Sequence, residues 1–208
     1  MSTALFSTAY FAPIQYFAHL TRSTDPIVES CEHFIKQTYR NRCIIATANG
    51  LMPLSLPIDK SDSEKTNIRD VKLSNHGNWQ HLHWNGIESA YNSSPFFEYY
   101  QDDLRPFFEN EPGYLFDFNE SIRMKICEVL DIQREVRYSQ EYIKEGELTT
   151  GWQDFRGIIH PKKNPAEVDR DFTPKPYYQV FDRKFGFQPN LSILDLLFNM
   201  GPESILYL

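Results

Sequence analysis

Apolar residues gather in two runs near the start of the chain, and a helix-like stretch separates the runs. Residues 4–11 form an apolar run typical of a buried strand, and Pro13 then suits the first turn of a helix over 14–20. A turn at 23–26 leads into a second apolar run at 26–35. This order predicts a strand, a helix and a strand.

The following pattern predicts a hairpin and then a more polar connection. Residues 42–58 contain two apolar runs joined at Asn49 and Gly50, a pair that tolerates the positive φ angles of a tight turn. The charged stretch 59–67 predicts an exposed loop, and 68–74 predicts a short strand after it.

The middle of the chain shows helical periodicity. Apolar residues recur every three to four positions over 79–91, which predicts an amphipathic helix. A second helix is expected to begin at Ser94 as N-cap, with Pro95 in its first turn. A third is expected from about Asn119.

The last part combines a strand, a long irregular stretch and a helix. Residues 134–142 predict a late strand, and 151–189 predict a loop so long that a functional role is expected. A final helix should start with Ser192 as N-cap and Asp195 as its capping-box partner, and end at Gly201.

Together these elements predict one α/β domain over residues 1–208. Its N-terminal strand-helix-strand half is expected to be Rossmann-like, and its C-terminal half mainly helical.

Composition excludes several classes of protein. A net charge of -7 argues against the continuous basic face that nucleic acid requires, so we expect no nucleic-acid partner. No segment approaches the roughly 20 apolar residues of a membrane span, and the N-terminus lacks the positive region of a signal peptide. We therefore expect a cytoplasmic protein. Three cysteines without a CxxC pattern indicate neither a disulfide framework nor a zinc finger.

One segment departs from this acidic balance. KQTYRNR, residues 36–42, carries Lys36, Arg40 and Arg42, and no Asp or Glu occurs in residues 33–58. Because guanidinium groups grip phosphate or carboxylate at two points, the segment is a candidate anion site. Alternatively, the arginines pair with acids from elsewhere or remain solvated.

The histidines do not predict a metal site. His81 and His83 lie two residues apart on the expected helix 79–91, so they point in nearly opposite directions and cannot share one ion. His83 falls on the apolar stripe, which favours a hydrogen-bonded core histidine over a ligand.

The segment DFRGIIHPKK provides a further candidate. Asp154, Arg156, His160 and Lys162 place an acid, a base and cations in or beside the long loop, as lids over active sites do. A solvated loop with an Asp-Arg pair is the alternative. No GxGxxG, Walker A, GxSxG or HExxH motif occurs anywhere in the chain.

Several motifs resemble those of the WbqC-like family of bacterial proteins, whose members are associated with surface-polysaccharide loci. The N-terminal motif is matched by Tyr10, Phe11, Pro13, Tyr16 and Phe17. The Lys-x-Ser-Trp-x-Asn-Arg motif is matched by Lys36, Thr38, Tyr39, Asn41 and Arg42. A His…Tyr…Pro-x-Phe pattern is matched by His83, Tyr91, Pro95 and Phe97, and the C-terminal motif by Pro189, Asn190, Leu191, Ser192, Asp195 and Gly201.

This resemblance implies a transferase acting on an anionic sugar or nucleotide-linked sugar in surface-polysaccharide (O-antigen-like) biosynthesis. Taking the motif matches together with the cationic segment and the long loop, we expect His83, His160 and Asp195 as catalytic residues. The expected substrate-binding residues are Lys36, Tyr39, Arg40, Asn41, Arg42, Arg156 and Asn190. The resemblance names no cofactor. The alternative is a non-catalytic binding or scaffold protein, which the aromatic runs FFEYY and PYYQVF favour.

Overall fold

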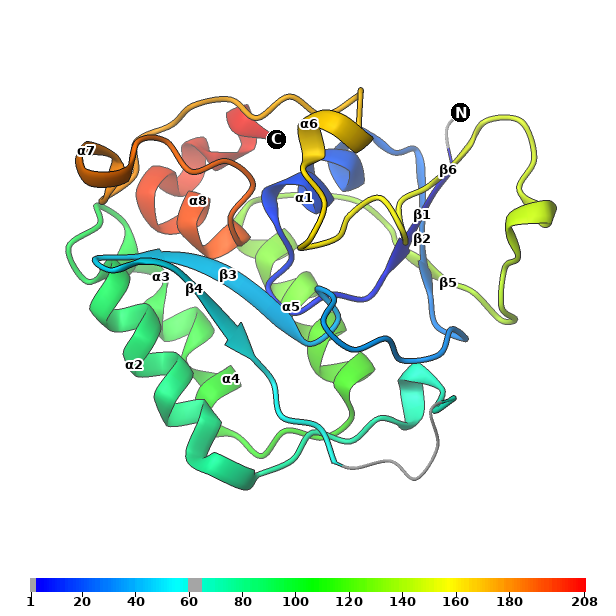
Figure 1. The fold of residues 1–208 in the computed structure, drawn as a ribbon, viewed down its shortest axis with the longest axis horizontal. Helices are drawn as coiled ribbons and strands as arrows, with labels where there is room; N and C mark the ends of the chain where they lie inside the picture. Colours follow the sequence, from blue (N-terminus) through cyan, green and yellow to red (C-terminus); the bar gives the residue numbers. More distant parts are fainter. Residues whose placement is uncertain (1–2, 60–64) are drawn as a thin grey trace.

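A four-stranded parallel sheet forms one part of the protein (Figure 1). The computed structural model describes residues 3–59 and 65–208. In spatial order the strands are β5 (Arg137–Tyr138), β2 (Asp25–Glu29), β1 (Thr3–Ser7) and β6 (Trp152–Asp154). Helices flank this sheet, so the expected α/β class is confirmed.

The sheet begins as a β-α-β unit. Helix α1 (Ile14–Arg22) carries the chain from β1 to β2, because parallel neighbours need a crossover connection. Leu5 and Phe6 of β1 are fully buried, as expected for a strand covered on both faces. The Rossmann-like opening predicted from the sequence is therefore present.

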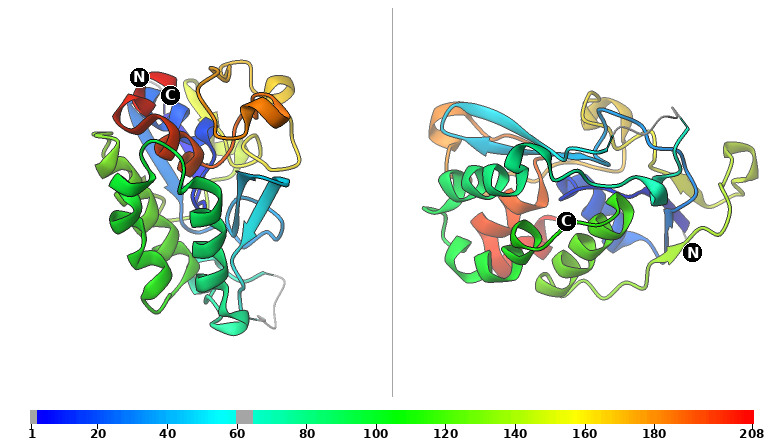
Figure 2. Two further views of the ribbon diagram at one scale, coloured as in Figure 1. Left: turned by 90° about the vertical axis from the view of Figure 1, so that its left-hand side faces the viewer. Right: turned by 90° about the horizontal axis from the view of Figure 1, so that it is seen from below.

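A separate hairpin follows the cationic segment. Strands β3 (Arg42–Thr47) and β4 (Gly50–Ser55) pair in antiparallel fashion, and Gly50 adopts a φ of 108° at the turn. The hairpin begins at Arg42 and turns at Gly50 as predicted, and its second strand ends at Ser55 rather than at Ile58. Figure 2 shows this hairpin beside helix α2 (Trp79–Tyr91), which β3 contacts.

The predicted helix over 79–91 is α2. The segment after Ser94 forms two short helices rather than one, and the third predicted helix begins four residues earlier than expected. These helices are α3 (Phe97–Leu104), α4 (Pro106–Glu109) and α5 (Leu115–Val129).

Two connections differ from the sequence predictions. The expected strand at 68–74 is instead a 3-10 turn, η1 (Ile68–Asp70), followed by isolated bridges at Lys72 and Leu73. Too few neighbouring residues pair there to make a ladder. Much of the predicted loop 59–67 lies outside the described residues.

The segment 151–189 is less irregular than predicted. It contains β6 together with the short helices α6 (Pro165–Val168) and α7 (Asp182–Phe185). β6 has three residues, too few for an alternating pattern to indicate a strand, and its pairing with β1 is not visible in the local sequence. β5 lies within the strand predicted over 134–142, but it is only two residues long.

The chain ends in helix α8 (Ile193–Met200) and a 3-10 segment, η4 (Gly201–Tyr207). The Ser192 hydroxyl accepts a hydrogen bond from the backbone N–H of Leu194, which confirms the predicted N-cap. The capping-box role of Asp195 was wrong: its carboxylate accepts hydrogen bonds from Tyr91 and Tyr177 instead.

In the described part of the chain, helices are too short or too polar to cross a membrane.

Candidate functional site

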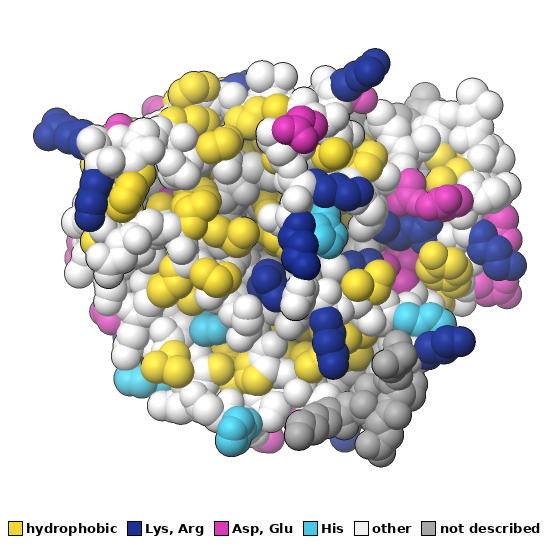
Figure 3. Space-filling model, viewed as in Figure 1, with side chains coloured by type: hydrophobic (Ala, Val, Ile, Leu, Met, Phe, Trp, Pro, Cys, Tyr) yellow, Lys and Arg dark blue, Asp and Glu magenta, His cyan; other side chains and the backbone are white. Residues whose placement is uncertain are grey.

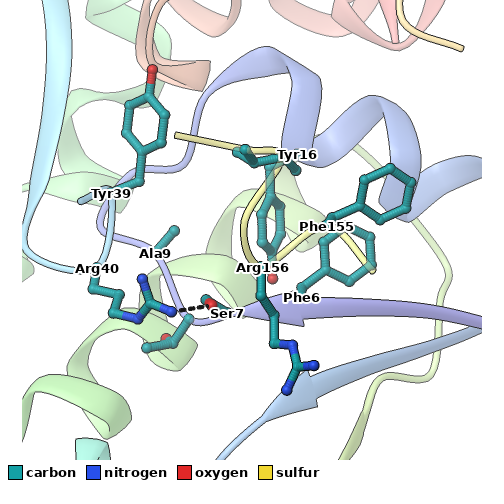
Figure 4. A pocket seen from close by; sticks show the side chains of 10 residues that line it. Phe6, Ser7, Ala9, Tyr16, Tyr39, Arg40, Phe155 and Arg156 are labelled. Carbon is teal, nitrogen blue, oxygen red and sulfur yellow. Dashed lines mark hydrogen bonds between the residues drawn. The ribbon is translucent and has the colours of Figure 1, made fainter. Parts of the chain in front are cut away.

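A narrow crevice lies where β1 and β6 end, at the carboxyl edge of the parallel sheet (Figure 4). The chain leaves β1 through α1 toward β2 on one side, while β6 joins β1 on the other. In open α/β sheets, ligands bind at the point where the chain connections of neighbouring strands run to opposite sides. The crevice is lined by Phe6, Ser7, Thr8, Ala9, Tyr16, Tyr39, Arg40, Phe155, Arg156 and Ile159.

Arg40 is held in the floor of this crevice by a two-point ion pair. Its Nε and one terminal nitrogen donate to the two oxygens of the Glu32 carboxylate, at 2.8 and 2.5 Å, and both side chains are buried. The same terminal nitrogen donates to the Ser7 hydroxyl at 2.6 Å, and Ser7 donates in turn to Glu32 at 3.1 Å. Arg40 therefore pairs with an acid just outside the acid-free stretch.

Burial raises the pKa of Glu32, although hydrogen bonds from Arg40 and Ser7 act in the opposite direction. The second acid at the end of β2, Glu29, is fully buried and accepts hydrogen bonds from four groups. These donors are the Ser139 hydroxyl, the backbone N–H groups of Cys31 and Ile143, and the Arg156 guanidinium. The two carboxylates belong to an extended hydrogen-bonded layer under the crevice.

Arg156 is fixed by the same layer. Its second terminal nitrogen donates to Asp154 at 2.6 Å, and its first donates to the Ile143 carbonyl at 2.7 Å as well as to Glu29. The expected pair of Asp154 and Arg156 therefore exists, but it is part of a rigid network at the end of β6. Arg156 and Arg40 line the crevice as paired rather than free cations.

Tyr16 differs from its polar neighbours. Its side chain comes from the first turn of α1 and is 3% exposed, yet its hydroxyl has no hydrogen-bond partner among the described residues. Burial raises its pKa, so the phenol stays neutral and can donate a hydrogen bond. In Figure 4 the hydroxyl points down toward the end of β1, where Ser7 lies.

Tyr39 forms the opposite wall of the crevice. Burial raises the pKa of its phenol to about 12, and its backbone carbonyl accepts a hydrogen bond from the Tyr10 N–H. The backbone contact fixes the cationic segment against the chain that follows β1. Tyr39 therefore lines the crevice, and its role in substrate binding stays a prediction.

A basic cluster borders the crevice. His160 follows Ile159, which lines the crevice, and its pKa is lowered first by burial and then by the positive charges of Lys163, Lys162, Arg40 and Arg42. Figure 3 shows Lys and Arg side chains gathered in the middle of this face. We call Arg42, His160, Lys162 and Lys163 the basic cluster.

Two segments far apart in sequence meet here. The Lys162 ammonium donates to the Gln37 side-chain oxygen at 2.6 Å, which joins the predicted lid segment to the cationic segment. The Nε of Arg42 is buried and has no hydrogen-bond partner in the described part of the chain. Arg42 therefore keeps a donor that no described residue accepts.

The hydrogen bonds of His160 define its chemistry. Its Nδ1 accepts from the backbone N–H of Lys162 at 3.1 Å, so the neutral ring carries its proton on Nε2. Nε2 of His160 is then a hydrogen-bond donor. This tautomer is better suited to donate to a ligand oxygen than to act as the general base expected from the sequence.

Two further residues of the cationic segment lie nearby. Asn41 donates from its amide to the Leu56 carbonyl at 3.3 Å, while its side-chain oxygen is buried without a partner among residues 3–59 and 65–208. Lys36 is exposed on the loop between β2 and β3.

Three other predicted site residues do not line the crevice. His83 lies on the buried face of α2, where its Nδ1 lies 2.9 Å from the Tyr10 hydroxyl and burial lowers its pKa to about 4. Asp195 is buried in α8, and burial raises its pKa despite hydrogen bonds from tyrosines. Asn190, at a φ of 55°, bonds to Gln15 through both side-chain atoms. Their functional roles stay predictions.

Ser7, Glu29 and Glu32 were not among the predicted site residues. Ser7 and Glu29 end the first two strands, and Glu32 lies three residues after the second. This position was the available signal, since parallel strands bring their carboxyl ends to one edge of the sheet. In the described residues no three His, Cys, Asp or Glu side chains converge as metal ligands do.

Comparison with known proteins places this geometry in a family. A curated protein of Mycobacterium tuberculosis, "Uncharacterized protein Rv1507c", is 26% identical over 215 residues, which cover 93% of this chain and 91% of that protein. No solved structure matches the chain. The model of the WbqC-like protein family matches residues 8–155, a span that includes Tyr16, Tyr39 and Arg40. The chain therefore belongs to the WbqC-like protein family.

Proposed function

We propose that this protein is a cytoplasmic transferase that binds an anionic sugar or nucleotide-linked sugar, with the basic cluster beside the crevice as its binding site. The observation that carries the proposal is the basic cluster at the mouth of a crevice that lies at the sheet's switch point. The role in surface-polysaccharide biosynthesis rests on the family alone.

Phosphate is the group that the basic cluster suits. Arg42 has a buried Nε donor without a partner in the described chain, and His160 offers Nε2–H. Lys162 and Lys163 add positive charge beside them. Arginine grips phosphate through several donors, and lysine contributes as a point charge, so the leaving phosphate of a transfer reaction would be held here.

The transfer itself needs a group that accepts a proton. The acceptor oxygen bonds to the transferred group, the bond to the phosphate oxygen breaks, and the phosphate leaves with the electron pair of that bond. Glu32 is the proposed proton acceptor, because the Ser7 hydroxyl in the crevice donates to it and can pass on the acceptor's proton. A pKa raised by burial makes Glu32 a better base than an ordinary carboxylate.

A non-catalytic binding protein is the second candidate. The observation in its favour is that the carboxylates under the crevice already accept hydrogen bonds from arginines: Glu32 from Arg40, and Asp154 from Arg156. A layer of paired charges can serve as a rigid platform for a ligand without taking part in chemistry.

Calorimetric titration with a panel of nucleotide sugars, acyl donors and divalent metals tests the proposal. We expect nucleotide sugars to bind, and Arg42→Ala to weaken binding about tenfold, the effect of one lost charge-assisted contact. Arg183→Ala on α7 removes the same charge from an exposed position and serves as control. If Arg42→Ala binds every hit as the wild type does, the basic cluster is not the anion site.

Release of nucleoside diphosphate then separates the two candidates. Turnover by the wild-type protein supports the transferase. Tight binding of a nucleotide sugar without turnover in the presence of varied acceptors favours the binding protein.

A further inference from the structure

A histidine of helix α1, His19, forms a buried pair with an acid from the segment that carries most of the basic cluster. Its Nε2 lies 2.6 Å from a carboxylate oxygen of Asp169, which directly follows α6, and both side chains are 4% exposed. The side-chain amide of Gln15, one turn earlier on α1, donates to the same oxygen at 2.6 Å. These buried bonds join α1 to the end of α6, which lies next to α1 in Figure 1.

The protonation of this pair follows from its contacts. Burial acts to raise the pKa of Asp169, but hydrogen bonds from Gln15 and His19 act in the opposite direction and leave this pKa lowered. The carboxylate is therefore ionised at neutral pH and only accepts hydrogen bonds. Nε2 of His19 must then carry a proton and donate a hydrogen bond to Asp169. Such a charge-assisted bond is stronger than one between neutral groups.

The same histidine holds the other end of that segment. The His19 ring stacks on the ring of Phe155, with centroids 4.0 Å apart and planes inclined by 25°. Phe155 directly follows β6, so His19 contacts both the first and the last residue of the segment 155–169. All members of the basic cluster except Arg42 lie between these two contacts.

Residues 160–168 have few other contacts that fix their position. They are exposed or half-buried throughout. Among the described residues, their hydrogen bonds stay within 157–169, with the exception of the bond from Lys162 to Gln37. The positive charges of the basic cluster also repel one another, which opposes gathering them at one place. The position of the cluster therefore depends on how the two ends of the segment are held.

We propose that His19 is a positioning residue of the anion site: it holds both ends of the segment 155–169 on α1 and thereby keeps the lysines and the histidine of the basic cluster beside Arg42. His19 itself is buried and acts through these residues rather than on the ligand. The inference rests on the proposed function, in which the basic cluster binds phosphate, and adds to it the group that assembles the site.

The pKa of His160, followed by NMR without any ligand, reports whether the cluster stays together. His19→Leu removes the bond to Asp169 and the aromatic stacking, while it retains an apolar side chain. We expect the pKa of His160 to rise in this variant, because the ring becomes more hydrated and moves away from Arg40 and Arg42. A role of His19 confined to stability would lower Tm and leave this pKa unchanged.

Calorimetric titration with inorganic phosphate measures the consequence for binding. His19→Leu should weaken phosphate binding about tenfold, since only a fraction of the molecules then holds the basic cluster together. His19→Gln should retain most of the affinity, because its amide can donate to Asp169 from near the position of Nε2.

Ser204→Ala is the matched control for a loss of stability alone. The buried Ser204 hydroxyl donates to the Leu196 carbonyl in α8. Its removal should lower Tm, and it should change neither the phosphate affinity nor the pKa of His160.

Asp169→Asn provides a second test if His19→Leu does not fold. It keeps the shape of the side chain and replaces charge-assisted bonds by neutral ones, so both effects should have the same direction and be smaller. If the phosphate affinity and the pKa of His160 stay at their wild-type values in the folded variants, His19 is not a positioning residue, and the anion site stands without it. If the wild type binds no phosphate, the proposed function falls and the anion site with it. A raised pKa of His160 in His19→Leu would then still confirm that His19 holds the segment.

Discussion

Arg40 and Glu32 form a buried two-point ion pair, and none of the residues between them in the sequence is acidic. Removing one partner of such a pair leaves an uncompensated charge in a poorly hydrated place. Glu32→Gln should therefore lower the free energy of unfolding by about 3 to 5 kcal/mol, as measured by urea denaturation.

An exposed pair provides the control for this change. Arg105 and Glu109 are bonded on the surface, where water and salt screen the charges. Glu109→Gln should leave the unfolding midpoint essentially unchanged. Equal effects of the two substitutions would contradict the assignment of Arg40 and Glu32 as a buried structural pair.

His83 should make stability depend on pH in a defined window. Its pKa is lowered to about 4 from 6.5, chiefly by burial. Between these values the unfolded chain binds a proton that the folded protein does not, so stability is lost as pH falls from 6.5 to about 4. The lost free energy approaches about 3 kcal/mol.

Comparison with His83→Gln isolates this contribution, because Gln does not titrate. The difference in unfolding free energy between wild type and variant, measured by denaturation at several pH values, should shrink on acidification in this window. Glu32 and Asp195 have raised pKa values and act in the opposite direction, since their contribution is lost as pH rises. A difference that is constant with pH would show that His83 is not buried in its neutral form.

The Asp195 carboxylate should depend on its tyrosine partners. Tyr177 donates to one carboxylate oxygen at 2.5 Å, and Tyr91 donates to the other at 2.8 Å. Tyr177→Phe leaves a buried carboxyl group with one donor fewer, so we expect a loss of about 1 to 3 kcal/mol in the free energy of unfolding, measured by chemical denaturation. Tyr99→Phe, at a position 75% exposed, should have no measurable effect.

The basic cluster predicts a measurable change in the pKa of His160. Burial lowers this pKa most, and the charges of Lys163 and Lys162 lower it further. Lys162→Ala should raise the pKa of His160, because one repelling cation is removed while the backbone N–H that bonds Nδ1 remains. Histidine resonances in an NMR titration report the change.

Lys175→Ala removes a cation whose ammonium bonds to the Leu206 carbonyl near the C-terminus, and it should leave the His160 titration unaltered. A pKa of His160 that falls in Lys162→Ala, or that shifts equally in both variants, would refute the proximity of the basic cluster.

Local patterns in the sequence were enough for elements that carry their own signals. The helical spacing of Trp79, His83 and Ile87 predicted α2 with its observed bounds, and the Asn49-Gly50 turn predicted the hairpin. Ser192 was found as N-cap because its hydroxyl acts on residues two positions away. These interactions are short in range, so a single segment reveals them.

The candidate site depends on contacts between distant segments, which the sequence does not display. The sequence left open whether Arg40 was free or paired, and its pairing with Glu32, eight residues earlier, became visible only in the fold. The meeting of Gln37 and Lys162 requires the whole fold, as does the burial of Tyr16 against Phe6. Residue types indicated an anion site in the cationic segment. Only the packing of the fold shows that Arg40 is paired with Glu32, while the Nε of Arg42 has no partner in the described chain.

The position of β6 also has a consequence for the order of folding. Leu5 in β1 is paired with Ile27, 22 positions away, and with Asp154, 149 positions away. Closing the longer loop costs more chain entropy, so β1, α1 and β2 should associate early and β6 should dock late. The wall of the crevice formed by Phe155 and Arg156 then assembles last, and ligand affinity can report the final step of folding.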